Sequence, residues 1–369
     1  MKMNEIKQKS VVGAKWTVIL SIIALPLSYI TSIILGRVSG DTLGIFALLN
    51  VFITFVTTFI ILGGSNVIIK YLPNLEQENK FLFLKSYLFI IAFITILAMI
   101  FIYLFPDSIK IVIGQGFSSN IVIYLIIFIP IIVFYSIFDY VLNGLIEVKT
   151  STLIKQLFVV GNFIIILLLF LFYREFFLEN SLFILFGLFL IFYALMGILS
   201  FYFSIKIMRG KKANFKSSDD NDRSFFKKFY FPKGFWHFLI FVHVSTILVF
   251  AYDKVDQLFL IANLNISELG FYYAAIQTAM LIRYVPTVIG GMLLPTFSNM
   301  MASKNESIIP RYYKYIVKYN TLMTVIAALF CIFFSKEILS MFGPSYVEYY
   351  LIIVILGTKI DQFLQNGAQ

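Results

Sequence analysis

The sequence predicts an all-α polytopic membrane protein with about ten transmembrane helices. Of its 369 residues, 60% are hydrophobic and only 13% are charged, whereas soluble domains are about 45–50% apolar and about 25% charged. Ten stretches have the roughly 20 apolar residues that are needed to cross a bilayer, and the basic residues collect in every other connection between them. A water-soluble fold of this length could not cover so much apolar surface, so lipid must surround most of the chain.

The ten predicted spans follow one another with mostly short connections that are rich in turn residues. Short connections force neighbouring helices to be antiparallel. The long exception is 206–233, which is polar and without periodicity and therefore indicates a linker. The spans are Val12–Leu35, Leu43–Ile69, Phe81–Phe105, Ile121–Ile146, Leu153–Tyr173, Ser181–Ile205, Phe235–Ala262, Leu269–Met292, Tyr312–Phe334 and Tyr349–Phe363.

The linker divides the predicted chain into two helical bundles. Residues 1–205 form an N-terminal bundle of six helices, and residues 206–234 form a basic cytoplasmic linker. Residues 235–369 form a C-terminal bundle with four helices. This division is our prediction of the domain organisation.

The basic residues predict which side of the membrane each connection faces. With the N-terminus inside, the cytoplasmic segments hold 22 Lys and Arg. The opposite connections hold only four, namely Arg37, Lys110, Arg174 and Lys336. Positively charged residues are retained on the cytoplasmic side of membrane proteins. The chain is therefore predicted to have both termini in the cytoplasm, and its net charge of +10 reflects topology and not nucleic-acid binding.

A weak internal repeat relates the two predicted bundles. The stretch 41–48, Asp-Thr-Leu-Gly-Ile-Phe-Ala-Leu, opens the second span, and 267–274, Ser-Glu-Leu-Gly-Phe-Tyr-Tyr-Ala, opens the eighth at an offset of 226. Gly63-Gly64 is matched by Gly290-Gly291, and 105–114 by 334–343. Six spans separate the copies, so both have the same orientation, as in the parallel repeats of transporters. The second copy stops after four of six helices, so we expect two further spans to be missing.

The sequence offers no metal or cofactor motif. Its single cysteine, Cys331, excludes an intrachain disulfide, and its two histidines, His237 and His243, lack metal-ligand spacing. We expect no cofactor, no metal and no covalent catalysis.

Four stretches resemble the polysaccharide flippase family, the O-antigen-type exporters of the multidrug/oligosaccharidyl-lipid/polysaccharide superfamily. They are loose patterns of small and aromatic residues, so they are more informative about the superfamily than about the substrate. The stretches are Ile34-Leu35-Gly36-Arg37-Val38 through 43–48, Tyr252-Asp253-Lys254-Val255-Asp256-Gln257 through 269–274, Pro295-Thr296-Phe297-Ser298, and Met341-Phe342-Gly343-Pro344-Ser345-Tyr346.

The resemblance implies two helical bundles around a central cavity that opens to one side of the membrane at a time. It implies that the substrate is a polyprenyl-diphosphate-linked oligosaccharide, which passes from the inner to the outer leaflet of the cell membrane. Glycan-assembly proteins are candidate partners, and a proton or a sodium ion is a candidate coupling ion. The sugar, the lipid carrier and the ion stay open.

Ionisable residues inside the spans are candidates for substrate contact, because burying them in hydrocarbon is costly. We expect Arg283 in the eighth span, and Lys254 in the seventh, to contact the diphosphate; Arg can do so with two parallel hydrogen bonds. Asp253 and Asp256 lie three residues apart on one helix face and are candidates for charge balance or ion coupling. An Asp–Arg pair that locks two helices together is an equal alternative.

Further polar residues have two interpretations each. Arg37, after the first span, is a candidate contact for the emerging headgroup or an interfacial anchor, and the anchor is favoured. Five residues are candidates for lining the cavity, namely Asp139, Asn143, Gln156, Asn162 and Gln277. For the first four of them, interhelical hydrogen bonding is the favoured alternative.

Two rival functions remain open. A multidrug or cation antiporter of the same superfamily would prefer an acidic cavity, whereas Arg283 and Lys254 favour an anionic substrate. A membrane glycan polymerase or ligase usually needs a large external loop, and the longest predicted outer connection is only about 106–120. A flippase is therefore the favoured function.

Overall fold

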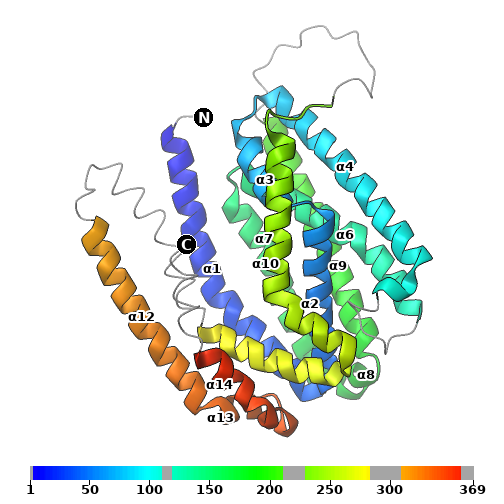
Figure 1. Ribbon diagram of the computed structural model, residues 1–369, viewed down its shortest axis with the longest axis vertical. Helices are drawn as coiled ribbons and strands as arrows, with labels where there is room; N and C mark the ends of the chain where they lie inside the picture. The colour runs from blue at the N-terminus through cyan, green and yellow to red at the C-terminus, as the bar shows by residue number, and fades with distance from the viewer. Residues whose placement is uncertain (1–2, 110–118, 211–228, 283–308, 359–369) are drawn as a thin grey trace. The chain divides into compact units, whose positions relative to one another are not determined.

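The computed structural model describes residues 3–109, 119–210, 229–282 and 309–358, and these are helical apart from short connections (Figure 1). Eight of the described helices are long and apolar enough to cross a membrane. The chain is thus a multi-pass helical membrane protein, as predicted. The longer elements are α1 (Met3–Val38), α2 (Gly40–Ile60), α4 (Gln77–Leu104), α6 (Ser119–Gly144), α7 (Val148–Phe172), α9 (Ser181–Gly210), α10 (Phe235–Asn263) and α12 (Ile309–Phe333).

Shorter elements join these helices. The eighth predicted span is described as a helix over 266–282 and then passes outside the described residues. The tenth is described up to Thr358 as α14, and its remainder lies outside them. The shorter elements are α3 (Gly64–Tyr71), η1 (Leu72–Asn74), η2 (Pro106–Ile109), α8 (Arg174–Glu179), α13 (Ser335–Ser340), η4 (Pro344–Tyr349) and α14 (Tyr350–Thr358).

Contacts divide the chain into two compact units. Unit 1 comprises 1–47, 159–184 and 266–369, and unit 2 comprises 48–158 and 185–265. Each unit therefore contains segments that precede the predicted linker and segments that follow it. Most of the linker itself lies outside the described residues. The division into bundles at 206–234 stays a prediction.

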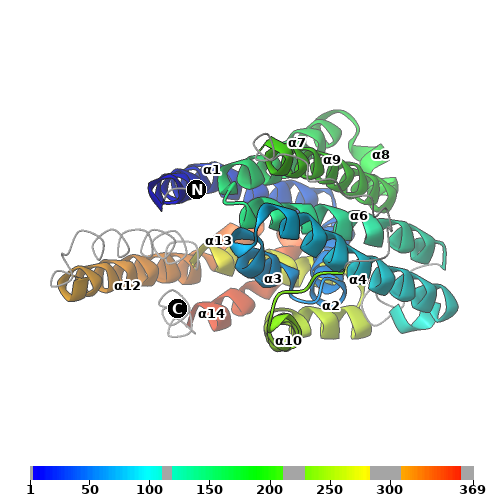
Figure 2. The same cartoon turned by 90° about the horizontal axis from the view of Figure 1, so that it is seen from above.

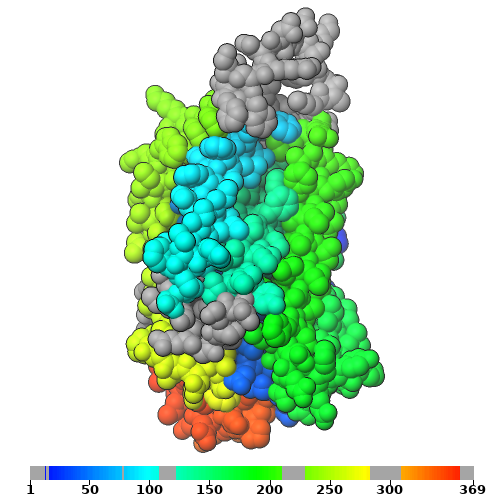
Figure 3. All heavy atoms as spheres, turned by 90° about the vertical axis from the view of Figure 1, so that its right-hand side faces the viewer, coloured from blue at the N-terminus to red at the C-terminus, as the bar shows by residue number. Residues whose placement is uncertain are grey.

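In unit 2, α6 and the greater part of α2 are the most buried of the described spanning helices. The spans of α2 and α6 are 67% and 61% buried, whereas those of α4 and α10 are 17% and 22% buried. The exposed face of α4 is apolar and aromatic; for example, Phe93 and Leu104 are 59% and 61% exposed. Side chains of α4 cover much of the face shown in Figure 3. Such an apolar surface is stable in lipid and not in water.

The second predicted span, Leu43–Ile69, is not one helix. Helix α2 ends at Ile60 and α3 begins at Gly64, because Leu62 and Gly63 have φ angles of 51° and 68°. A left-handed residue ends a helix, and glycine adopts this conformation without strain. A Cβ atom at Gly63 would also lie 2.6 Å from Cγ1 of Val242. The glycine pair therefore stops the helix and allows α10 to approach.

The break frees backbone groups that need partners inside the membrane. The hydroxyl of Tyr87 on α4, which is fully buried, donates to the carbonyl oxygen of Ile61 at 2.5 Å. The amide of Gly64 donates to the same oxygen at 3.0 Å. Beyond the break, α3 packs between α6 and α10 (Figures 1 and 2).

We expect Tyr87→Phe to lower the stability of the protein by about 1–2 kcal/mol, because it removes a donor from a buried carbonyl. Thermal unfolding in detergent measures the effect. Tyr103→Phe on the same helix is the matched control, because Tyr103 is 73% exposed, and it should change nothing. Equal melting temperatures for the two variants would contradict the proposed role of Tyr87.

In unit 1, the segment 266–282 packs against α1 and the start of α2. The hydroxyl groups of Tyr29 and Thr278 are hydrogen-bonded at 2.9 Å, and the rings of Phe46 and Tyr273 meet edge to face at 6.2 Å. Helices α12, α13 and α14 form a second group of contacts in this unit.

Candidate functional site

The most deeply buried charge in the described residues belongs to a polar cluster between α6 and α7 in unit 2. The side chain of Asp139 is 4% exposed, and one carboxylate oxygen lies 2.8 Å from Nζ of Lys155. The hydroxyl of Ser151 donates to the other oxygen at 2.5 Å. The amide of Asn143 donates to Ser151 Oγ at 3.1 Å and to the backbone oxygen of Asp139 at 2.9 Å.

This cluster brings together two residues that the sequence predicted as cavity lining, Asp139 and Asn143, with two that it did not. The sequence predicts Lys155 only as a cytoplasmic charge and does not single out Ser151. The sequence spacing could have indicated that these two residues act together. Lys155 is four residues after Ser151, so both lie on one face of α7. The contacts hold two helices together, and a cavity role for Asp139 and Asn143 stays a prediction.

Two predicted amides on α7 have buried oxygen atoms without a hydrogen-bond partner among the described residues. They are Oε1 of Gln156, in unit 2, and Oδ1 of Asn162, in unit 1. Buried polar atoms are nearly always paired, so each marks a position where a polar ligand or water would be stabilised. Lining of a cavity by these two residues stays a prediction.

The predicted charges on α10 lie near a glutamine that sequence reasoning missed. Nζ of Lys254 lies 3.4 Å from Oε1 of Gln257, which is 2% exposed. A carboxylate oxygen of Asp256 accepts a hydrogen bond from the backbone amide of Gln257 at 2.7 Å. Asp253 is exposed. The spacing of three residues between Lys254 and Gln257 could have indicated that their side chains are neighbours on the helix.

In unit 1, Arg37 joins the end of α1 to α13. Its Nε donates to the backbone oxygen of Met341 at 2.6 Å, and Nη2 donates to that of Ser340 at 3.3 Å. Basic side chains commonly bind the free carbonyls at the end of a helix. The backbone oxygen of Arg37 in turn accepts from Nη2 of Arg174 at 3.1 Å. A headgroup contact by Arg37 stays a prediction.

The remaining candidates are Gln277 and Arg283. Nε2 of Gln277 donates to the hydroxyl of Tyr273 in unit 1. Arg283 lies outside the described residues, so its predicted contact with the diphosphate stays a prediction.

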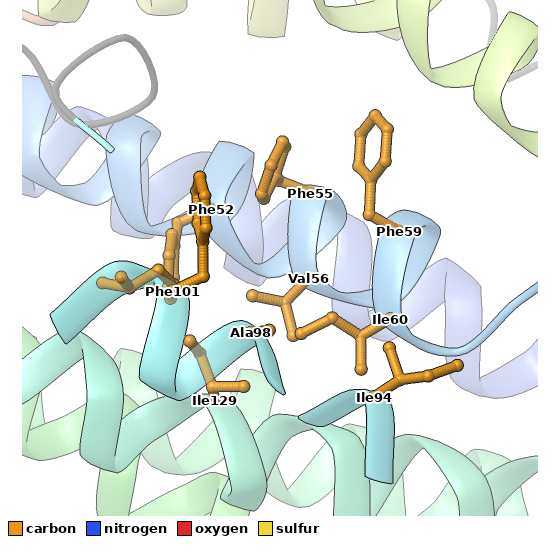
Figure 4. Close-up of a pocket in the computed structure, with 10 residues that line it drawn as sticks. Phe52, Phe55, Val56, Phe59, Ile60, Ile94, Ala98, Phe101 and Ile129 are labelled. Atoms are coloured by element: carbon orange, nitrogen blue, oxygen red, sulfur yellow. The ribbon is translucent and has the colours of Figure 1, made fainter. Parts of the chain in front are cut away.

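An apolar cavity of about 250 Å³ lies between α2, α4 and α6 in unit 2. Val56 and Ile60 of α2 face Ile94 and Ala98 of α4 across it (Figure 4). Every lining residue is apolar, so the cavity would take hydrocarbon in preference to water. The other lining residues are Phe52, Phe55, Phe59, Phe101, Ile102 and Ile129.

The fold has a counterpart among solved structures. A structure described as MATE in the bent conformation matches 98% of this chain and 80% of its own chain, with a TM-score of 0.55 and 16% identity. This likeness shows the fold. No curated protein matches the chain.

The apolar helices and this fold define the class, a polytopic membrane protein with a transporter-like architecture. The family model described as "Polysaccharide biosynthesis protein" matches residues 10–301. The chain therefore belongs to the polysaccharide biosynthesis protein family. The fold is similar to that of a membrane transporter, and the expectation of a flippase that is not an enzyme stays a prediction.

Proposed function

We propose that this protein translocates a polyprenyl-diphosphate-linked oligosaccharide across the cytoplasmic membrane by alternating access. The observation that carries the proposal is the family match over 10–301 on a chain with a MATE-like fold. Polysaccharide synthesis that begins on the inner leaflet requires a carrier for the finished lipid-linked unit. Both termini face the cytoplasm in this proposal.

The substrate combines a long hydrocarbon tail with an anionic, hydroxyl-rich head. The apolar cavity beside α4 suits the tail, because its lining is apolar and Phe101 at its edge is 53% exposed. In this proposal Arg283 and Lys254 bind the diphosphate. Asp253 and Asp256 balance charge or couple transport to a proton or sodium gradient.

Complementation tests the proposal. A strain without its own flippase should regain surface polysaccharide when it expresses this chain, and lipid-linked glycan should stop accumulating on the inner leaflet. Resistance to cationic drugs without restored glycan export would instead support the antiporter.

A second experiment tests the apolar cavity. We expect Ala98→Trp to fill it and to reduce glycan export by about tenfold, because losing the burial of one or two methylene groups costs about 1–2 kcal/mol. Ala92→Trp is the matched control, since Ala92 lies on an exposed part of the same helix. Both variants must reach the membrane in equal amounts. Equal export by the two would exclude this cavity as the tail site.

A further inference from the structure

The exposed face of α12, in unit 1, changes from basic to apolar along the helix. Helix α12 packs against α13 and α14, and another of its faces is open. Toward the end of the helix this open face consists of four apolar side chains that are between 46% and 75% exposed, Leu322, Ile326, Leu329 and Phe333. Residues spaced three and four apart share one face of a helix. The four therefore form a continuous apolar surface, which suits lipid chains.

The start of the same face carries two lysines and two tyrosines. Lys314 and Lys318 are one helical turn apart and are both exposed. Tyr315 and Tyr319 are 49% and 57% exposed. Neither lysine has a carboxylate partner among the described residues. Tyrosine is favoured at the boundary between hydrocarbon and water, so the cations adjoin the apolar surface at the level where lipid headgroups lie.

Helix α12 is too short to keep Lys318 away from the hydrocarbon. Its uncharged part, 319–333, is about 22 Å long at 1.5 Å per residue, whereas the hydrocarbon core is about 30 Å thick. Lys336 follows the helix closely, so the helix cannot gain apolar length at that end. Lys318 therefore lies at the edge of the hydrocarbon, with Lys314 about 6 Å and Arg311 about 10 Å farther out. A lysine at this depth extends its ammonium group to the headgroup layer.

The corresponding surface of α4, in unit 2, is apolar and covered by the chain itself. The predicted repeat relates 105–114 to 334–343 at an offset of 229, which makes Phe89 the counterpart of Lys318. The ring centre of Phe89 lies 5.2 Å from that of Phe229. On α12 a charge replaces this apolar contact. An apolar protein segment would bury that charge at a cost, whereas an anion would balance it.

We propose that this face of α12 binds an anionic phospholipid of the leaflet that the predicted topology places on the cytoplasmic side. Lys314 and Lys318 bind the headgroup phosphate, and the hydroxyl groups of Tyr315 and Tyr319 donate hydrogen bonds to headgroup oxygens. The acyl chains lie along the apolar surface. A lipid of zero net charge would leave the two lysines without a counter-charge. The proposal does not depend on which molecule the protein transports.

Brominated phospholipids test the site, because bromine on an acyl chain quenches a tryptophan that it contacts. Leu322→Trp places a reporter next to the lysines, and Trp16→Phe with Trp236→Phe removes the two native tryptophans. The protein is reconstituted in mixtures of phosphatidylglycerol and phosphatidylcholine in which one lipid or the other is brominated. Phosphatidylglycerol should be preferred about twenty-fivefold, because each basic residue near an anionic membrane surface contributes about fivefold.

Two paired substitutions locate the preference. Lys314→Gln with Lys318→Gln should abolish it, so that the two lipids quench the reporter equally. Lys149→Gln with Lys206→Gln is the matched control, because it removes two exposed lysines from other helices, and it should leave the preference unchanged. None of these four lysines is buried, so both double variants should fold.

Three results would overturn the proposal. The first is equal quenching of the reporter protein by the two brominated lipids, or a preference that survives the loss of Lys314 and Lys318. The second is quenching by neither lipid, which would show that protein covers this face. The third is displacement of phosphatidylglycerol by polyprenyl diphosphate at a tenth of its concentration, which would assign the site to the transported substrate and not to a phospholipid.

Discussion

Lys155→Met should lower the stability of the protein by roughly 3 kcal/mol, one of the two largest effects that we expect. The substitution leaves the carboxylate of Asp139, 4% exposed, without its cation. Removing one partner of a buried pair is costly because the other charge stays buried. We place the value at the low end of the usual range because Lys155 itself is 48% exposed and Ser151 still donates to the carboxylate. Chemical or thermal unfolding in detergent measures the loss.

Two controls separate the ion pair from other effects of this substitution. Lys149→Met changes an exposed lysine on the same helix and should cost much less. Adding Asp139→Asn to Lys155→Met should recover part of the lost stability, because the buried charge is then gone. A double variant that is less stable than Lys155→Met alone would show that the pair is not the source of the effect.

Arg283→Ala should reduce glycan export by about a hundredfold or more while the protein still reaches the membrane. Hydrogen bonds to charged groups are worth about 1.5–3 kcal/mol each, and a guanidinium can form two of them with a phosphate. Arg283→Lys keeps the charge but not the paired geometry, so it should retain intermediate activity. Export is measured from surface polysaccharide in the complementation strain.

Arg311→Ala is the control for this series. Arg311 lies in the first turn of α12, and its guanidinium lies 5.9 Å from the ring centre of Tyr315, so it is a basic residue outside the proposed diphosphate contact. This variant should export normally. If Arg283→Ala also exports normally, the phosphate-binding role of Arg283 is wrong.

The helices could be predicted because lipid imposes one simple condition on each of them. A spanning segment must be apolar for about 20 residues, and this is visible in the sequence without knowledge of its neighbours. The break at Leu62 and Gly63 escaped the prediction because apolarity does not distinguish a helix from an interrupted one. The signal was the pair Gly63-Gly64, but glycine pairs also occur within membrane helices. The buried hydroxyl of Tyr87, which compensates the break, lies 26 residues from Ile61.

The candidate site was harder to predict because its residues are defined by their neighbours. Sequence reasoning identified Asp139 and Asn143 as polar residues within a span. It could not show that Lys155, assigned to the cytoplasmic side by its charge, extends to Asp139. The match between 41–48 and 267–274 was visible in the sequence, but not the contact between them, since a repeat says nothing about which of its faces meet.

The interruption between α2 and α3 also affects how these two helices can move. An unbroken helix rotates and tilts as a single rigid element, whereas two helices joined at a glycine can change their orientation independently. Because α3 is packed against α6 and α10, it is anchored to them, and α2 can tilt without dragging it. We therefore expect amide hydrogen exchange to be fastest, within this span, at residues 62 and 63.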